Sequence, residues 1–179
     1  MKDLLGVDPA DILVHGPKKI LIDKIHWHLP DTGVVVSYTP KARDVEDHFG
    51  IFRGVDQIES FAQAINGCCL AFLECMKQKC DLAYLKANFT PIFLGIGQVN
   101  FKNVLREGET YISIGKITFY KFRNITCEGR IYKVPKDLDL DAYFSKYTKE
   151  GLLDYELNDD FTLIAELSEV TGKLIKNEK

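Results

Sequence analysis

The chain has 179 residues, of which 46% are hydrophobic and 27% are charged, and its formal net charge is −3. This length suits one globular domain with its own core, and the weakly acidic balance, without a block of lysine and arginine, argues against nucleic-acid binding. The longest apolar stretch, residues 58–76, is interrupted by Glu59, Gln63 and Glu74, so no membrane span is expected. The N-terminal sequence lacks the apolar core of a signal peptide, and we expect a cytoplasmic protein.

The first forty residues predict a short helix and then a β-hairpin. Asp8 is placed to cap a helix that begins at Pro9 and ends at Gly16. Residues 19–29 (KILIDKIHWHL) and 34–40 (VVVSYTP) are rich in β-branched and apolar side chains, and a turn-forming segment separates them. These two segments are therefore predicted to be the antiparallel strands of one hairpin.

A long buried helix is predicted after a loop at residues 41–56. From Val55 to about Lys79, apolar side chains recur at steps of three and four, and the opposite side of the helix is also largely apolar. A helix that is apolar nearly all round must be surrounded by protein on most sides.

The second half of the chain predicts several antiparallel strands. Strand-like segments separated by turn residues cover residues 81–93, 97–108, 109–124 and 125–135. The acidic segment at about residues 135–160 is interpreted as an insertion before a last strand at 161–170, and the tail after that strand is expected to fray. The prediction is a single α+β domain over residues 1–179, with an antiparallel sheet wrapped around one long central helix.

No metal site and no cofactor are predicted. The five cysteines are an odd number without a CxxC pair, which is typical of buried free thiols. His26 and His28 alternate around Trp27 on a predicted strand. With no carboxylate or thiolate partner nearby in the sequence, they are expected to be exposed strand histidines.

The start of the predicted central helix carries residues suited to acid–base chemistry. His48 in the preceding loop can act as a general base near neutral pH, and Glu59 lies early in the helix, where burial would favour a general acid. Gly54 permits close approach of a ligand, and the N–H groups of Gly54 and Val55 are placed to hold an oxyanion. Together these groups suit proton abstraction beside a carbonyl and loss of a hydroxyl group. Each also has a purely structural interpretation, as a surface histidine, a helix-capping glutamate or a turn glycine.

Two blocks of the sequence resemble the hotdog-fold β-hydroxyacyl-[acyl-carrier-protein] dehydratases of fatty-acid synthesis. Residues 15–25 (HGPKKILIDKI) are similar to the family's H-x-x-P-x-L-L-V-D-R-V run. Residues 48–67, which contain GVDQIESFAQAING, are similar to its H-F-P-x-x-P-x-x-P-G-V-L-x-I-E-A-x-A-Q motif. The later strands follow in the family's order, so the resemblance covers most of the chain outside residues 135–160 and the tail.

The resemblance implies the dehydration of 3-hydroxyacyl thioesters to trans-2-enoyl thioesters, carried on acyl carrier protein or coenzyme A. By position, His48 corresponds to the family's catalytic histidine, and Glu59 corresponds to its acidic partner. Gly54 corresponds to the glycine whose N–H polarises the thioester carbonyl, and Gln63 to the glutamine one helical turn beyond the glutamate. In that family the histidine and the glutamate of one site come from different subunits, so the resemblance also implies a homodimer or a higher homo-oligomer.

The histidine loop departs from the family motif. It is three residues shorter between His48 and Gly54, and Gly50 and Arg53 stand where the motif has proline. A displacement of about 1 Å in an active site can cost a hundredfold in rate. Two alternatives therefore stay open: a hotdog acyl-thioesterase in which Glu59 activates water, and a non-catalytic acyl-binding module.

Overall fold

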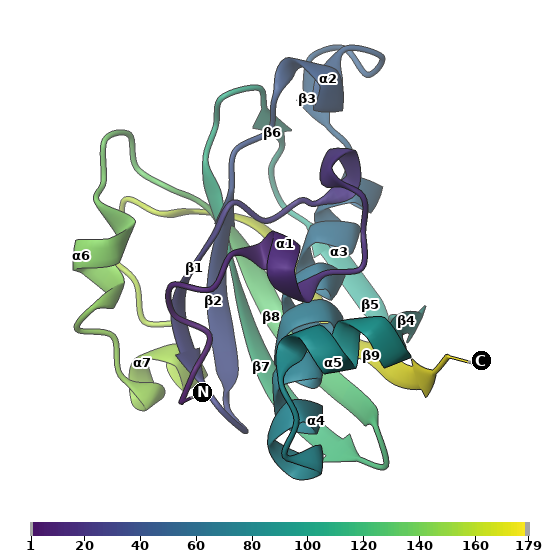
Figure 1. Ribbon diagram of the computed structural model, residues 1–179. Helices are drawn as coiled ribbons and strands as arrows, with labels where there is room; N and C mark the ends of the chain where they lie inside the picture. The colour runs from purple at the N-terminus through teal and green to yellow at the C-terminus, as the bar shows by residue number, and fades with distance from the viewer. Residues whose placement is uncertain (1, 178–179) are drawn as a thin grey trace.

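The computed structural model describes residues 2–177, and its largest element is a curved antiparallel sheet (Figure 1). The strands of this sheet are β1 (Lys24–Leu29), β2 (Gly33–Tyr38), β4 (Phe89–Gly95), β5 (Gln98–Phe101), β7 (Tyr111–Lys121), β8 (Asn124–Lys133) and β9 (Thr162–Lys176). Their order is β1-β2-β7-β8-β9-β4, and β5 also pairs with β9. Two short strands, β3 (Ile51–Phe52) and β6 (Leu105–Arg106), pair with each other outside it. The predicted hairpin of β1 and β2 is confirmed.

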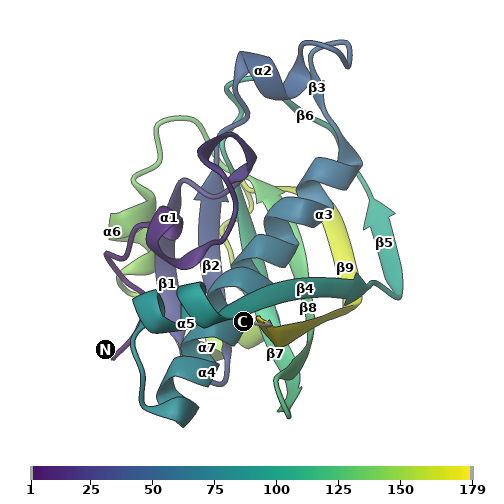
Figure 2. The ribbon, with the colours of Figure 1, turned by 45° about the vertical axis from the view of Figure 1, so that its right-hand side comes forward.

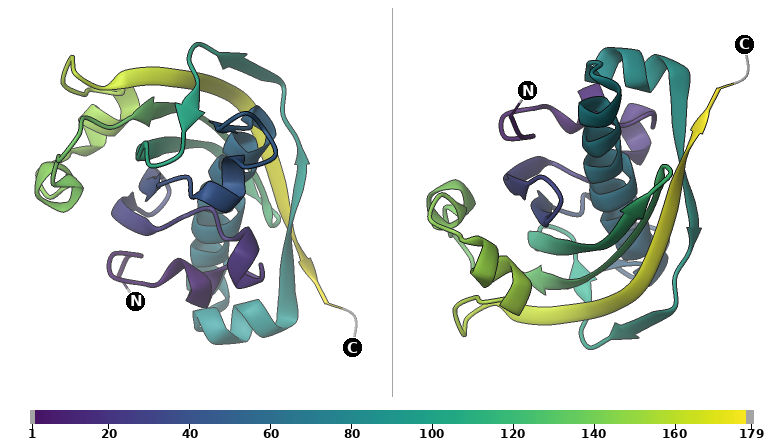
Figure 3. Two further views of the ribbon diagram at one scale, coloured as in Figure 1. Left: turned by 90° about the horizontal axis from the view of Figure 1, so that it is seen from above. Right: turned by 90° about the horizontal axis from the view of Figure 1, so that it is seen from below.

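A continuous helix fills the concave side of the sheet, as Figure 2 and Figure 3 show. It consists of α3 (Gly54–Ala62), the π-helical segment η2 (Gln63–Cys69) and α4 (Leu70–Gln78). Every residue from 60 to 75 is buried, as expected for a helix that is apolar nearly all round. The predicted hotdog architecture, an antiparallel sheet wrapped around one long helix, is confirmed.

Two glycines let the helix lie close to the sheet. A Cβ at Gly115 in β7 would lie 2.3 Å from Cδ1 of Ile65, and a Cβ at Gly129 in β8 would lie 2.4 Å from Cε2 of Phe61. Because protein interiors are close-packed, neither position has room for a methyl group without movement of its neighbours. The two glycines therefore set the spacing between helix and sheet.

The N-terminal segment runs past the central helix before it enters β1. Helix α1 (Pro9–Ile12) begins at the predicted proline, and the Asp8 side chain accepts a hydrogen bond from the backbone N–H of Ala10. The helix ends before the predicted Gly16, because Leu13 is already extended and its side chain is fully buried. A short 3-10 turn, η1 (Pro17–Lys19), follows.

Three sequence predictions about element boundaries are wrong. Residues 81–93 contain helix α5 (Leu82–Asn88) before β4, because Asp81 caps this helix by accepting a hydrogen bond from the N–H of Tyr84. The predicted loop at 41–56 contains α2 (Ala42–Val45) and β3. The tail predicted to fray continues β9 to Lys176, because β4 pairs with this part of the strand. Its last two residues, 178 and 179, lie outside the described residues.

Residues 135–160, the predicted insertion, cover one end of the convex face of the sheet (Figure 3). They form α6 (Leu140–Phe144) and α7 (Lys149–Asp154), and Trp27 Nε1 donates a hydrogen bond to the carbonyl oxygen of Tyr147. A second apolar cluster, separate from the core around the central helix, is buried beneath them: Val35, Ile112, Ile114, Tyr132, Leu140, Phe144, Leu152 and Phe161. Both faces of the sheet are therefore packed.

The prediction that His26 and His28 are exposed is wrong. A β-bulge between Ile25 and Trp27 places the two histidines against different layers. The His26 ring lies 6.3 Å from the ring of Phe144 in α6, while the His28 ring lies 4.8 Å from that of Phe72 in α4. The tertiary structure supplies both with partners that the local sequence does not contain.

The cysteines are free thiols, as predicted, with Cys80 half-buried and the other four buried. Within residues 2–177, no three histidine, cysteine, aspartate or glutamate side chains are grouped so that they could hold a metal ion. None of the helices in this range is long and apolar enough to cross a membrane.

Candidate active site

The predicted oxyanion-binding residues form the first turn of α3. The helix begins at Gly54, and the Arg53 side chain cannot cap it, because a guanidinium has no hydrogen-bond acceptor. Arg53 Nε donates a 2.7 Å hydrogen bond to the Asp56 carboxylate. A Cβ at Gly54 would lie 2.7 Å from Cζ of Phe101, so a larger residue here would have to displace that half-exposed ring. Val55 follows with its side chain 63% exposed. The N–H groups of a first helical turn have no partner within the helix, so they are available to an anionic ligand atom.

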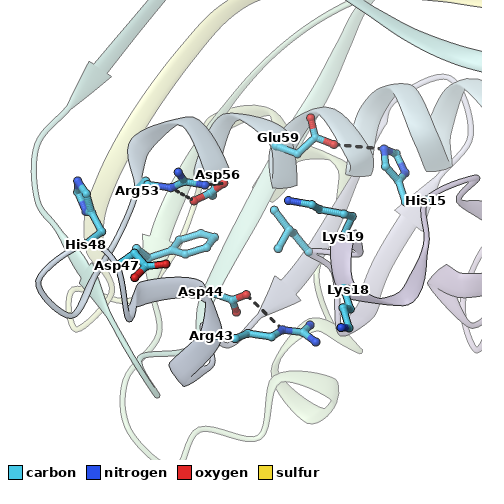
Figure 4. A pocket seen from close by; sticks show the side chains of 12 residues that line it. His15, Lys18, Lys19, Arg43, Asp44, Asp47, His48, Arg53, Asp56 and Glu59 are labelled. Carbon is cyan, nitrogen blue, oxygen red and sulfur yellow. Dashed lines mark hydrogen bonds and ion pairs between the residues drawn. The ribbon is translucent and has the colours of Figure 1, made fainter.

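An open cleft of about 580 Å³ meets this turn at Arg53 and Asp56, whereas Gly54 and Val55 line a neighbouring groove (Figure 4). This volume is within the range of about 300–1,000 Å³ that is typical of small-molecule sites. Its lining comes from the N-terminal segment, α2, the histidine loop and α3: His15, Lys18, Lys19, Leu21, Arg43, Asp44, Asp47, His48, Phe52, Arg53, Asp56 and Glu59. The cleft thus brings the predicted His48 and Glu59 to one site.

Glu59 is held by two neighbours within the chain. Its Oε1 lies 3.3 Å from His15 Nε2 and accepts a hydrogen bond of 2.9 Å from Gln63 Nε2. The bond to His15 lowers the pKa of Glu59; partial burial opposes this effect, and the bond from Gln63 adds to it. The Glu59 side chain is 44% exposed, so a carboxylate faces the cleft at neutral pH.

Gln63 fastens the N-terminal segment to the central helix. Its Oε1 accepts a 2.8 Å hydrogen bond from the N–H of Leu21, and its Nε2 donates a 2.7 Å bond to the carbonyl oxygen of Lys19. Ser60 Oγ adds a 2.7 Å bond to the carbonyl oxygen of Leu21. The amide of Gln63 is therefore occupied by protein groups, and its position holds His15 beside Glu59.

His48 lies at the other end of the cleft. Figure 4 shows the Arg53–Asp56 ion pair between His48 and the Glu59–His15 pair. The exposed His48 side chain has Nδ1 3.1 Å from the carbonyl oxygen of Ile51. Within one chain, His48 and Glu59 line the same cleft without touching each other.

A second, smaller cavity begins on the other side of Glu59. It has a volume of about 230 Å³ and is lined by His15, Glu59, Ala62, Gln63, Asn66, Gly67, Pro91, Ile92 and Phe93. Since Glu59 and His15 line both spaces, the carboxylate stands between the open cleft and a smaller cavity whose lining is partly polar and partly apolar. This arrangement suits an extended ligand that reaches into both spaces.

Several site residues were missed by sequence reasoning. The local sequence gives no partner for Glu59, because His15 is 44 positions away. The only signal was the position of His15 at the head of the first block that resembles the dehydratases. The basic side chains of Lys18, Lys19 and Arg43 carry no motif, and only the fold brings them to the cleft.

Comparison with known proteins supports the fold. No protein-family model and no curated protein matches this sequence. The dehydratase heterocomplex ApeI:P from Xenorhabdus doucetiae is similar, with a TM-score of 0.63 and 15% identity over 97% of this chain and 93% of that chain. A thioesterase family protein from Silicibacter pomeroyi has a TM-score of 0.51 and 12% identity over 86% of this chain and 85% of that chain. The PaaI protein of the phenylacetic acid degradation operon of E. coli has a TM-score of 0.50 and 11% identity over 88% and 82%.

At these identities the likeness establishes the hotdog fold and no particular reaction. The names of these similar structures include both a dehydratase and a thioesterase. The choice between dehydration and thioester hydrolysis therefore depends on the residues of the cleft.

Proposed function

We propose that this protein dehydrates 3-hydroxyacyl thioesters to trans-2-enoyl thioesters, with Glu59 as the central acid–base group. The observation that carries this proposal is the placement of Glu59, which His15 holds where an open cleft meets a smaller cavity. A thioester bound beside Glu59 would place its reacting carbons at the carboxylate. Its carrier end would lie in the cleft and its acyl end in the cavity.

The elimination needs one group to take a proton and another to give one. The proton on C2 leaves to a base, a C2–C3 double bond forms, and the C3 hydroxyl departs as water after it is protonated. The N–H groups of Gly54 and Val55 are the candidates to hold the negative charge that develops on the thioester oxygen. His48 of a second subunit is the candidate base, as the resemblance implies.

Glu59 in this scheme protonates the departing hydroxyl, although its lowered pKa keeps it a carboxylate at rest. It must therefore receive a proton before it can give one. His15 Nε2, 3.3 Å from the carboxylate, is the group placed to supply it. This assignment makes His15 a partner of Glu59 rather than a group that touches substrate.

Two lysines of the cleft are the candidates to meet the carrier end of the substrate. The lining contains as many acidic as basic side chains, and Arg43 and Arg53 are paired with Asp44 and Asp56, so this role is given to Lys18 and Lys19. Acyl carrier protein and coenzyme A both present the thioester on a phosphate-bearing arm, and basic side chains attract phosphate. The small cavity has no lysine or arginine in its lining, so the acyl group is the part that it suits.

A homodimer is part of the proposal, because His48 and Glu59 of one chain do not meet. Beside His48 lies a groove of about 450 Å³ that includes Val55, Phe101 and Val104, with side chains 63%, 47% and 50% exposed. Exposed apolar side chains gathered in one place are typical of an interaction surface. A second copy of the chain bound at this groove would cover these apolar side chains. The His48 loops of both copies would then lie next to the interface.

Hydrolysis of acyl thioesters is the second candidate, and the ionised state of Glu59 favours it. A carboxylate that is held by two hydrogen-bond donors can activate a water molecule without a second base. This reaction would not require His48. A non-catalytic acyl-binding module would require neither residue for its activity.

One assay separates the three. Purified protein is mixed with 3-hydroxyacyl thioesters of short and medium length on pantetheine, coenzyme A and acyl carrier protein, while enoyl absorbance and free thiol are followed together. Dehydration that is lost in both His48→Ala and Glu59→Gln supports the proposal. Thiol release that survives His48→Ala but not Glu59→Gln supports the hydrolase, and the absence of both products with every substrate supports the binding module.

A further inference from the structure

Asn66, in the middle of the central helix, has a buried side-chain amide without a partner. The residue is 3% exposed, and neither Oδ1 nor Nδ2 has a hydrogen-bond partner among residues 2–177. An amide can donate two hydrogen bonds and accept two, and buried polar groups are almost always paired in native proteins. This side chain therefore has an unused capacity for both donation and acceptance.

The backbone around Asn66 leaves space for this buried amide. Asn66 lies at the centre of the π-helical segment η2, and short π-helical segments occur often at functional sites. On the facing strand β9, a Cβ at Gly172 would lie 2.3 Å from Cγ of Asn66, so only glycine leaves space for the amide. Helix geometry and the opposite strand thus both accommodate a polar side chain in an apolar layer.

Asn66 also lines the cavity of about 230 Å³ that begins at Glu59, with its buried amide packed towards Gly172 behind the lining. A ligand group in the cavity meets the amide when this side chain turns towards it. Seven positions separate Asn66 from Glu59, which corresponds to a rise of roughly 10 Å along a helix. Apart from the residues around Glu59 itself, the cavity is lined by apolar side chains and glycine, such as Ala62, Ile92 and Gly67. Asn66 is therefore the polar residue in the part of the cavity that lies away from Glu59 and the reacting carbons.

We infer that this cavity selects short acyl groups that carry a hydroxyl or amide group beyond the reacting carbons, and that Asn66 binds that group. This inference rests on the proposed function, because it takes the cavity as the acyl end of the site. A hydroxyl or an amide both donates and accepts hydrogen bonds, which matches the two unpaired functions of the Asn66 side chain. A purely apolar acyl chain would leave both of them unpaired, and sites of this kind reject such ligands.

The test uses two unreactive analogues, in which an amide replaces the thioester of acyl-pantetheine. One carries a hexanoyl group and the other a 6-hydroxyhexanoyl group, and calorimetry gives the dissociation constant of each. We expect the wild-type protein to bind the hydroxylated analogue about tenfold more tightly, since one discriminating hydrogen bond to a neutral group has roughly that effect. In Asn66→Leu the preference should disappear or reverse, and Asn66→Ala provides a smaller substitution if leucine disturbs the fold.

Ser113→Ala is the matched control. Ser113 is fully buried and its Oγ is also without a partner among the described residues, but it lines neither the cleft nor the cavity. This substitution removes an unpaired polar atom and should leave the preference unchanged. Equal binding of the two analogues by wild type, no binding of either, or a preference that persists in both Asn66 variants overturns the inference.

The dehydration assay is run on the same preparations to separate the two proposals. Turnover of 3-hydroxyhexanoyl thioester without any preference for the hydroxylated analogue removes this inference and leaves the proposed function. A preference that depends on Asn66, in a protein that neither dehydrates nor hydrolyses, removes the proposed reaction and leaves the selectivity of the cavity.

Discussion

At the scale of single residues, the protonation of Glu59, which is paired with His15, and of the buried His28 decides how the molecule responds to pH. Glu59 is kept ionised by His15, which lies far from it in the sequence. His28 is kept neutral by burial against the central helix, which lowers its pKa to about 4 despite the nearby Asp3. The first effect concerns activity, and the second concerns stability.

Replacement of His15 by alanine should change the pH dependence of turnover. Without the bond from His15, the pKa of Glu59 rises from below its usual value of about 4.3. In the proposed reaction Glu59 must hold a proton, so without His15 to supply one kcat/KM should decline as the pH rises from the acidic range to neutrality. At pH 7 it should fall about tenfold, less than the 10²–10⁴-fold contribution of a direct acid–base group. His15→Gln keeps a hydrogen-bond donor but has no proton to supply, so its profile should resemble that of His15→Ala. A wild-type profile in both variants would contradict this role.

The buried His28 should make the protein sensitive to acid. The unfolded chain binds a proton at this residue below about pH 6.5, whereas the folded chain binds it only near pH 4. Stability is therefore complete above about pH 6.5 and is lost as the pH falls towards 4, by at most about 3 kcal/mol from this group. Urea unfolding at pH 7 and pH 4.5 measures the loss. His28→Gln, whose side-chain oxygen can still accept the bond from the N–H of Leu4, should show a smaller loss, and an equal loss would refute the assignment.

At the scale of secondary-structure elements, the distance between the central helix and the sheet is the sensitive quantity. It is set by glycines in β7 and β8 that face Phe61 and Ile65. It matters for the site because the same helix carries Glu59 near one end and Asn66 in its middle. A shift of the helix would move both residues relative to the strands that enclose the cavity.

Gly129→Ala should destabilise the fold by about 1–3 kcal/mol, the range typical of overpacked cores. Its Cβ would lie 2.2 Å from the backbone oxygen of Ile114, which cannot move as a side-chain end can. Thermal unfolding measures the change. Gly95→Ala is the control, since its Cβ would meet nothing closer than 3.7 Å, and it should stay within about 0.5 kcal/mol of wild type. Equal effects of the two substitutions would show that the close contacts at Gly129 do not limit stability.

At the scale of the whole molecule, the two faces of the sheet pack against different parts of the chain. The concave face holds the central helix and the candidate site, and one end of the convex face is covered by the helices of residues 135–160 (Figure 3). The groove at Val55, Phe101 and Val104 is left as an apolar surface beside the histidine loop. The proposed dimer uses this surface, so assembly and activity should be lost together.

Val104→Lys should convert the dimer to a monomer at micromolar concentration and abolish dehydration. A lysine placed in an apolar interface would lose its hydration without gaining a partner. Sedimentation velocity and the enoyl assay are read on the same sample. Phe122→Lys is the control, because Phe122 is 72% exposed in the turn between β7 and β8 and does not line the groove. A Val104→Lys monomer with full activity would exclude a site shared between subunits.

The sequence by itself determined the elements whose signals are local. The 3- and 4-residue periodicity of residues 55–79, the alternation in β7 and the turn between β1 and β2 each depend on neighbours along the chain, so periodicity and turn chemistry were sufficient. A sheet around the helix followed, since a helix that is apolar nearly all round must be enclosed by protein, and the resemblance to the dehydratases identified this arrangement as the hotdog fold. Glu59 and His48 were predicted as site residues from one block of sequence, and the fold places both at one cleft.

Only the tertiary structure decided which side chains meet. His15 reaches Glu59 because Gln63 and Ser60 hold the N-terminal segment against α3, and the bulge at His26 divides two histidines between two layers. The tail joins β9 because β4 pairs with it. Asn66 is without a partner because Gly172 lies opposite it on a strand more than 100 residues away. Contacts of this kind depend on distance in space, and the periodicity of a sequence carries information only about neighbours along the chain.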